Sequence, residues 1–228
     1  SSSCSAYEGL HGRPPKFDNS QIRYGAPETA GILESDEISE SSGLAASKCQ
    51  DNVFWTHNDS GDGPFIFAID PTGKHLGVWR LPNAENVDWE DIAAFKDSIG
   101  KCFIYVGDIG NSAKEMRGRL KIYRIPEPIV PDEVSDSTRR TARETAAPEV
   151  LEFNYPDKPH DAETLLVHPS SGQIYIVTRE RKEPAGVFTL KGEFSGEPET
   201  ARRIGEIKVP AVPFGFLTGG DISPDGTR

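Results

Sequence analysis

The sequence has no apolar run long enough to form a transmembrane helix. Its longest runs are of the length of Phe65 to Ile69, whereas crossing a bilayer takes roughly 20 apolar residues. Methionine is nearly absent as well: the chain begins at Ser1 and its single methionine is Met116, so we expect a processed product or an excised piece of a longer protein. Basic residues are outnumbered, with 25 Lys and Arg against 36 Asp and Glu, for a net charge of −11. Because a negative surface repels phosphate groups, nucleic acids and anionic membranes are not expected partners.

Helical periodicity is lacking too, whereas turn residues are abundant. The chain holds 22 glycines and 18 prolines. Short β-branched and aromatic runs recur between clusters of Gly, Asp, Asn and Pro, and no longer stretch carries a helical apolar stripe. The pattern predicts an all-β fold of short strands joined by tight turns.

Four kinds of strand recur three times in the same order. The first strand consists of small or aliphatic residues, and the second ends in a polar residue. The third has a β-branched residue, an aromatic residue, any residue and an aliphatic residue in that order, and the fourth is again short and apolar. The expected strands are 43–46, 53–58, 66–69 and 77–81 in the first unit, 91–94, 103–108, 122–125 and 150–153 in the second, and 164–167, 174–179, 187–190 and 204–209 in the third. Four-stranded repeats of this length are typical of the blades of a β-propeller.

A fourth copy begins at Asp221 to Ser223 and stops at the turn Pro224 to Gly226. The chain is therefore expected to supply about three blades plus one strand of a ring, and propellers typically have about 4 to 8 blades. Remaining blades or a second chain would complete it. We expect residues 1–36 to form a polar N-terminal arm and residues 37–228 a partial propeller, with a charged insert at about 128–147.

Acidic residues gather on one face of the expected propeller. Consecutive blade strands run antiparallel, so the connections into each first strand and those after each second strand share a face. The candidate metal ligands on this face are Asp88, Glu90, Asp91, Asp108, Asp161, Glu163 and Asp221. Oxygen ligands without a His or Cys set indicate Ca²⁺ rather than Zn²⁺. The alternative is that these residues are ordinary turn formers, with Asp88 or Asp161 capping loop amides.

Further candidates on the same face would bind a ligand. They are Asn58, Asp59, Asp62, His160 and Arg179. Arg179, with Arg181 and Lys182 beside it, is the cationic spot of this face and would hold a phosphate or carboxylate; the alternative is a solvated run of charge.

Several of these motifs together resemble a known family. They are Asn-Asp-Ser-Gly-Asp-Gly at 58–63, Asn-Val-Asp-Trp-Glu-Asp-Ile-Ala at 86–93, Gly-Asp-Ile-Gly-Asn at 107–111, His-Asp-Ala-Glu at 160–163 and Thr-Gly-Gly-Asp-Ile-Ser-Pro-Asp-Gly at 218–226. From about Ser41 to Arg228 the chain resembles largely uncharacterised secreted bacterial β-propeller proteins. The family usually carries an Asp after Gly-Asp-Ile-Gly, where this sequence continues with Asn111 and Ser112. The resemblance implies a propeller of six-bladed type and an extracytoplasmic location, and it implies no established activity.

Two functions follow as hypotheses. The first is an extracellular calcium-binding propeller that acts as a binding or scaffold module. The second is a metal-assisted hydrolase of phosphoesters or lactones that uses the acidic face, with Arg179 holding an anionic small molecule.

The three cysteines predict one disulfide and one odd thiol. None lies in a Cys-x-x-Cys spacing, so a zinc or redox motif is not expected. Cys49 and Cys102 precede second strands of neighbouring units, on the face opposite the carboxylates, and are within reach of one another if these turns lean together. The bridge between Cys49 and Cys102 is less expected than the two alternatives combined, which are a disulfide that includes Cys4 and free thiols.

Overall fold

The structure is a computed structural model that describes residues 25–111, 116–132, 136–180, 183–208 and 216–228. These residues form strands β1 to β14 and one short 3₁₀ helix, η2 (Arg139–Thr141), with no α-helix. The predicted all-β class is confirmed. Residues 1–24, 112–115, 133–135, 181–182 and 209–215, which include Cys4, Ser112, Arg181 and Lys182, lie outside the described residues.

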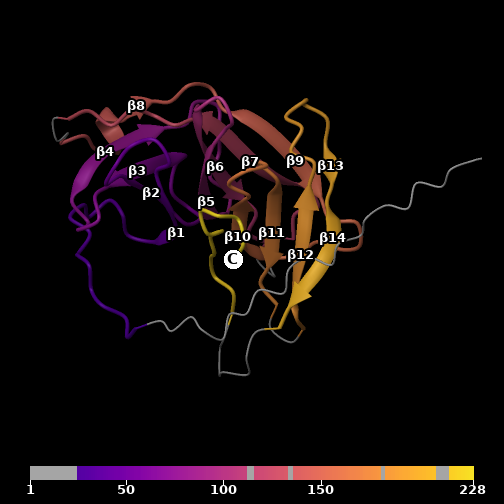
Figure 1. The fold of residues 1–228 in the computed structure, drawn as a ribbon. Helices are drawn as coiled ribbons and strands as arrows, with labels where there is room; N and C mark the ends of the chain where they lie inside the picture. The colour runs from indigo at the N-terminus through magenta and orange to yellow at the C-terminus, as the bar shows by residue number, and fades with distance from the viewer. Residues whose placement is uncertain (1–24, 112–115, 133–135, 181–182, 209–215) are drawn as a thin grey trace, which may run out of the picture.

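The strands form three sheets, each built on four antiparallel strands (Figure 1). The first two sheets carry a fifth strand, which is two residues long and parallel to its neighbour. The first sheet has the order β1 (Ser41–Ala46), β2 (Phe54–Asn58), β3 (Phe65–Ile69), β4 (His75–Arg80) and β8 (Arg143–Glu144). The second has the order β5 (Trp89–Lys96), β6 (Cys102–Asp108), β7 (Leu120–Pro126), β9 (Glu149–Asn154) and β13 (Glu199–Thr200). The third has the order β10 (Ala162–Val167), β11 (Ile174–Thr178), β12 (Ala185–Leu190) and β14 (Arg202–Ile207). Each predicted four-stranded unit is therefore one sheet.

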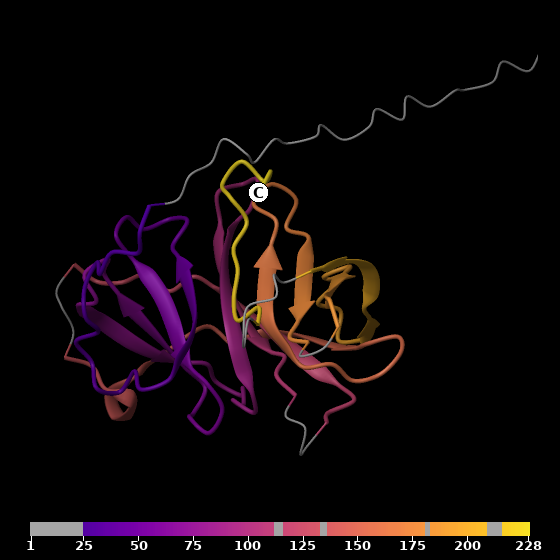
Figure 2. The ribbon, with the colours of Figure 1, turned by 90° about the horizontal axis from the view of Figure 1, so that it is seen from below.

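The three sheets fan out from their first strands. Strand β5 contacts β1 on one side and β10 on the other. Figure 1 shows these three strands at the centre, beside the yellow C-terminal segment, and Figure 2 shows the sheets standing side by side. The carboxylate-bearing ends of the first strands therefore lie close to one another.

Two apolar cores hold neighbouring sheets together. Between the first and second sheets, Trp55, Trp79 and Trp89 are buried with Tyr123. Between the second and third, Phe153 and Phe188 pack with aliphatic residues of β7, β10 and β11. The apolar face of each sheet thus supplies the driving force for the arrangement, because burial of large aromatic side chains dominates core energetics.

The outer strands of the first two sheets are each covered by a two-residue parallel strand from the following unit. Strand β8 comes from the connection between β7 and β9 and pairs with β4, where Thr145 N donates to Arg80 O at 3.0 Å. Strand β13 comes from the connection between β12 and β14 and pairs with β9, where Ala201 N donates to Asn154 O at 2.8 Å. Within the described residues, the outer edge of β14 has no such cover.

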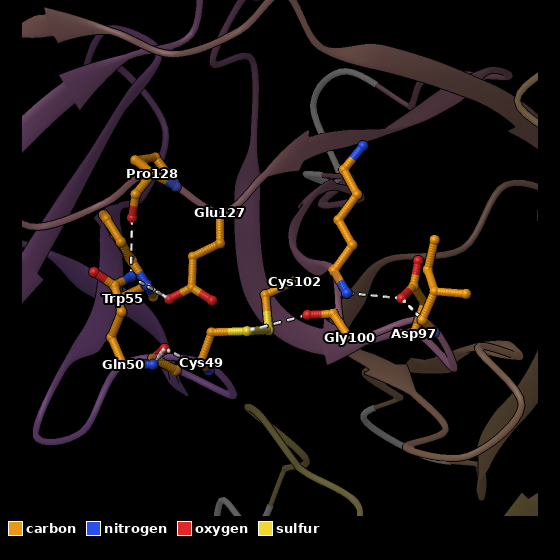
Figure 3. The surroundings of a disulfide bond; sticks show 11 residues. Cys49, Gln50, Trp55, Asp97, Gly100, Cys102, Glu127 and Pro128 are labelled. Carbon is orange, nitrogen blue, oxygen red and sulfur yellow. Dashed lines mark hydrogen bonds between the residues drawn. A yellow bond between two sulfur atoms is a disulfide. The ribbon is translucent and has the colours of Figure 1, made fainter.

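A disulfide joins the first two sheets. Cys49, in the turn between β1 and β2, is bonded to Cys102 at the start of β6, with 6.2 Å between their Cα atoms. The preference for a Cys4 pairing or free thiols is therefore wrong: the turns of neighbouring units lean together closely enough for the bridge. Figure 3 shows Glu127 beside the bridge, where Glu127 Oε1 accepts from Gln50 Nε2 at 2.8 Å and from Trp55 Nε1 at 2.9 Å.

The N-terminal and C-terminal segments of the described chain pack against the sheets but add no strand to them. Ile32 N and Glu34 N donate to the carbonyl groups of Thr72 and Gly73, in the turn between β3 and β4. Asp221 to Ser223, expected as the first strand of a fourth unit, is not a strand, because no second strand is present among the described residues to pair with it. The turn that follows does form, with Gly226 N donating to Ser223 O at 2.7 Å. No helix in the described part of the chain is long and apolar enough to cross a membrane.

Candidate metal centre

Three carboxylates meet where the first and second sheets adjoin. One oxygen each of Asp59, Asp88 and Glu90 lies within 4.8 Å of the others. Asp59 directly follows β2, Asp88 directly precedes β5, and Glu90 is the second residue of β5. The carboxylates of Asp88 and Glu90 meet, while Trp89 between them is buried in the core. We call Asp59, Asp88 and Glu90 the acidic cluster.

Equivalent bulges aim one side chain of each first strand at this region. The register shifts between Ser41 and Gly43 in β1, between Trp89 and Asp91 in β5, and between Ala162 and Thr164 in β10. The residues that occupy the bulges are Ser42, Glu90 and Glu163. Ser42 Oγ donates to Glu90 Oε2 at 3.2 Å. Because a bulge turns a side chain out of the regular alternation, the three repeats place three polar groups in a row at the centre of the molecule.

A glycine backbone packs against the acidic cluster. Gly110 N donates to the main-chain oxygen of Asp88 at 3.1 Å. A Cβ atom at position 110 would lie 2.4 Å from Glu90 Oε1 and 2.5 Å from Asp88 Oδ2. Only glycine therefore leaves both carboxylates in place.

Two arginines neutralise the carboxylates that flank the cluster. Arg117 Nη1 pairs with Asp108 Oδ1 at 2.7 Å, and Arg117 Nη2 donates to Gly110 O at 2.5 Å. Arg179 pairs with Glu163. Among the described residues, no basic side chain forms an ion pair with Asp59, Asp88 or Glu90. The acidic cluster is thus the part of the site whose charge is not balanced within the described chain.

The protonation of Glu90 reflects this imbalance. Burial, followed in order of importance by the nearby charges of Glu163, Asp59 and Asp88, raises its pKa to about 9. Burial also raises the pKa of Asp88, with the charge of Asp59 adding to the effect. A carboxyl group in such surroundings holds a proton at neutral pH unless a cation replaces it.

The other predicted metal ligands have partners in the protein. Asp108 Oδ1 accepts from Asp88 N at 3.0 Å as well as from Arg117, and Asp161 Oδ1 accepts from Asn111 N at 2.8 Å. Asp91 accepts from Ile92 N through Oδ1 and from Leu165 N through Oδ2, at 2.9 and 2.8 Å. Asp161 and Asp91 therefore cap main-chain amides, as the alternative interpretation held for Asp161.

Asp221 lies at the edge of a cleft between β1 and the C-terminal segment. It is exposed and lies 3.9 Å from Lys48 Nζ. The cleft, of about 320 Å³, is also lined by Asp91 and by Ser41 to Leu44. The structure does not bring Asp221 into the acidic cluster.

Two of the predicted ligand-binding residues hold loops in place. Asn58 accepts from Ser39 N and Glu40 N and donates to Glu37 O. Asp62 pairs with Arg139 Nη1 at 2.5 Å.

His160 is buried, with Nδ1 2.9 Å from Glu180 and Nε2 3.1 Å from Asp157. Both ring nitrogens of His160 therefore already have a neighbouring carboxylate as partner. Of the predicted ligand-binding residues, Asp59 belongs to the acidic cluster and Arg179 lies beside it.

Sequence reasoning missed Arg117, Ser42 and the backbone of Gly110. Arg117 follows β6 by nine positions in a loop and shows no periodicity that links it to Asp108. Ser42 carries a weak signal, because its position is equivalent to those of Glu90 and Glu163 in the repeat.

Comparison with known protein families and with curated protein sequences finds no match to this chain.

The three carboxylate oxygens of the cluster are close enough together to share one metal ion. Ca²⁺ binds oxygens at about 2.3 to 2.6 Å, so oxygens on opposite sides of one ion lie up to about 5 Å apart. The spacing within 4.8 Å in the acidic cluster agrees with that geometry. The donor set consists of oxygens, which suits a hard cation rather than Zn²⁺.

Proposed function

We propose that this chain is part of an extracellular β-propeller whose central acidic cluster binds Ca²⁺ and that it acts as a binding or scaffold module. The observation that carries the proposal is the meeting of Asp59, Asp88 and Glu90, the last two of them against Gly110, without an ion pair from the described residues. A cation there would relieve the mutual repulsion of the three carboxylates and tie β2 to β5.

Propeller architecture is supported by the repetition of one sheet. Each of three units is an antiparallel four-stranded sheet whose first strand lies at the centre and carries a bulge at the same place. Rings of such sheets typically have about 4 to 8 blades. Remaining blades or a second chain would complete the ring, as the proposed six-bladed type requires.

An extracellular location is supported by the disulfide between Cys49 and Cys102. Such bonds persist in oxidising compartments and are rare in the cytosol.

The second candidate is a metal-assisted hydrolase of phosphoesters or lactones. It is favoured by Arg179, which borders the cluster through Glu163 and whose Nε has no hydrogen-bond partner among the described residues. In this function Arg179 would hold the anionic group of a small molecule beside the cation.

Calcium titration by isothermal calorimetry tests the proposal. The chelator-treated protein is expected to bind Ca²⁺ saturably and to melt at a higher temperature in Ca²⁺ than in EDTA. Glu90→Gln should weaken binding at least about tenfold, since it removes one of three charged ligands. Asp51→Asn, an equal change of charge at an exposed turn position, should bind as the wild type does.

Absence of binding heat, or equal binding by Glu90→Gln, would overturn the calcium proposal. Hydrolysis of phosphoester or lactone substrates that requires Ca²⁺ and is lost in Arg179→Ala would establish the second candidate.

A further inference from the structure

The outer edge of β14 differs from the outer edges of the other two sheets. Strands β4 and β9 are covered by β8 and β13, whereas β14 is uncovered within the described residues. All six residues of β14 are exposed, and Ile204 and Ile207 are 44% and 42% exposed. The corresponding parts of β4 and β9 bury Trp79 and Phe153 almost completely. An exposed strand edge with exposed isoleucines is suited to pairing with another extended segment.

The main chain of Glu206 faces this open edge. Glu206 lies opposite Gly186 in β12, and Gly186 N donates to Thr178 Oγ1 on the side of β11. In an antiparallel ladder, directly opposite residues either exchange both N–H···O=C bonds or point these groups away from one another. Glu206 therefore directs its N–H and C=O away from β12.

The covered edge of the first sheet has the same geometry. Arg80 lies opposite Phe65 in β3, at the position of the repeat that Glu206 holds opposite Gly186. The carbonyl of Arg80 faces outward and accepts from Thr145 N. Glu206 thus offers the acceptor that the covering strand uses in the first sheet.

The covering strands share chemistry as well as direction. Both run parallel to the strand they cover, and both lie in a Glu-Thr-Ala sequence, at 144–146 and at 199–201. On β14 and the residue that follows it, the exposed cations Arg202, Arg203 and Lys208 outnumber Glu206. An acidic segment complements this strand.

We propose that the open edge of β14 binds an extended acidic segment of the Glu-Thr-Ala type, which adds to the third sheet as a parallel strand. A main-chain N–H of the segment donates to Glu206 O, as Thr145 N does to Arg80 O in the first sheet. This pairing repeats at the third sheet what β8 and β13 do at the first two. It involves no group of the acidic cluster, so it holds whether or not the protein binds calcium.

The test is a nuclear magnetic resonance titration of the ¹⁵N-labelled chain in EDTA with a synthetic peptide of residues 195–201, Ser-Gly-Glu-Pro-Glu-Thr-Ala. We expect saturable amide shifts confined to β14 and the adjoining part of β12, with slower hydrogen exchange at Glu206. The same peptide carrying an N-methyl group at its final alanine should bind at least tenfold more weakly, since Ala201 N is the donor in the β13 pairing.

Two variants make the result specific. In Glu206→Pro, the proline ring takes the place of the outward N–H and obstructs the open edge beside the Glu206 carbonyl, without removing a bond to β12, so it should abolish the shifts. Glu206→Ala keeps the main chain and should retain them. Unchanged melting temperatures would show that both variants fold.

Shifts scattered over the protein, no shifts, or binding by Glu206→Pro equal to that of the wild type would overturn the proposal. Concentration-dependent dimerisation of the free chain that is lost in Glu206→Pro would assign the edge to a second copy and also overturn it. Because the titration is done in EDTA, a negative result leaves the calcium proposal unaffected, and a failure of calcium binding leaves the edge proposal unaffected.

Discussion

Glu90 and Asp91 are neighbours in β5 whose carboxyl groups have different surroundings. Glu90 occupies the bulge and faces Asp59 and Asp88, where its charge is opposed. Asp91 faces two main-chain amides, and its Oδ2 joins β5 to β10 through Leu165 N. Burial nevertheless raises the pKa of Asp91 to about 7. The two residues are expected to affect stability in distinguishable ways.

The pH dependence of stability should report Glu90. Its pKa is about 9 in the folded protein against an ordinary 4.5, so between these values the folded state binds more protons than the unfolded state. In EDTA, the free energy of unfolding should therefore fall as pH rises from about 5 to about 9, with Asp91 adding to the fall up to about pH 7. Under the calcium proposal, the ion is expected to take the place of the proton and to flatten this decline.

Chemical denaturation across this pH range measures the effect, with Glu90→Gln as the control that has a shallower slope. A free energy of unfolding that rises with pH in EDTA would contradict the assignment.

Asp91→Ala should destabilise the protein without involving calcium. The change leaves the buried amide of Leu165 without its acceptor, which costs about 1 to 3 kcal/mol. The loss in the free energy of unfolding should be the same in calcium and in EDTA, with Asp51→Ala as the exposed control. A loss seen in calcium alone would instead make Asp91 a metal ligand.

At the scale of elements, the loop that follows β6 shapes the acidic cluster as much as the strands do. Ile109 is buried and anchors the loop, while Gly110 lies against both carboxylates of Asp88 and Glu90. Arg117 returns to the same loop and bonds to the carbonyl of Gly110. The loop thus holds the carboxylates at a fixed spacing.

Gly110→Ala should weaken calcium binding. The added methyl group would lie 2.4 Å from Glu90 Oε1, so the carboxylates must separate and the coordination geometry is lost. We expect at least about a tenfold weaker affinity by calorimetry. Gly118→Ala, in the same connection with open space around its Cβ position, serves as the control. Equal affinities for the two variants would show that Gly110 does not set the spacing.

Removing the disulfide should lower stability substantially. The bridge spans a sequence separation of 53 residues, for which the chain-entropy estimate is about 4 kcal/mol. The double variant Cys49→Ser/Cys102→Ser should show this loss in denaturant, while the wild type in reducing agent should match it. A change below about 1 kcal/mol would mean that the network of Gln50, Trp55 and Glu127 holds the two sheets together without the bridge.

The sequence predicts the main strands because their residues obey local rules, and it fails where contacts depend on distant chain segments. Runs such as Ile174 to Val177 alternate or continue as buried strands and are recognisable from β-branched and aromatic residues. Strands β8 and β13 are polar and two residues long, so nothing in their composition predicts pairing with β4 and β9.

The same limit applies to the site. Carboxylates at the strand ends could be predicted on one face, but their partners could not. Whether Asp91 meets an amide or a cation is decided by the position of Leu165, which lies 74 residues further along the chain.

For the whole molecule, order should decrease from the second sheet toward the third. The second sheet is packed on both sides, with one apolar core shared with the first sheet and the other with the third. Strand β14 is exposed along its full length. Local opening is easiest where few apolar contacts must be broken.

Native-state hydrogen exchange should show this gradient. We expect the amides of β5 and β6 to be the slowest and those of β14 the fastest among strands of five or more residues. Mass spectrometry of exchanged peptides provides the measurement. Protection of β14 equal to that of β6 in the free chain would mean that its edge is already occupied.

Strands β8 and β13 cover strands that precede them in the chain, so each of the first two sheets is completed only after part of the following unit has been synthesised. The strand that finishes the first sheet, Arg143–Glu144, is translated more than sixty residues after the end of β4, and β13 likewise appears long after β9. A nascent chain released after its first unit would therefore expose the Arg80 acceptor until the second unit emerges from the ribosome. Each unit protects the one made before it, and a chain stopped between units would leave its most recently made sheet prone to pairing with other nascent chains.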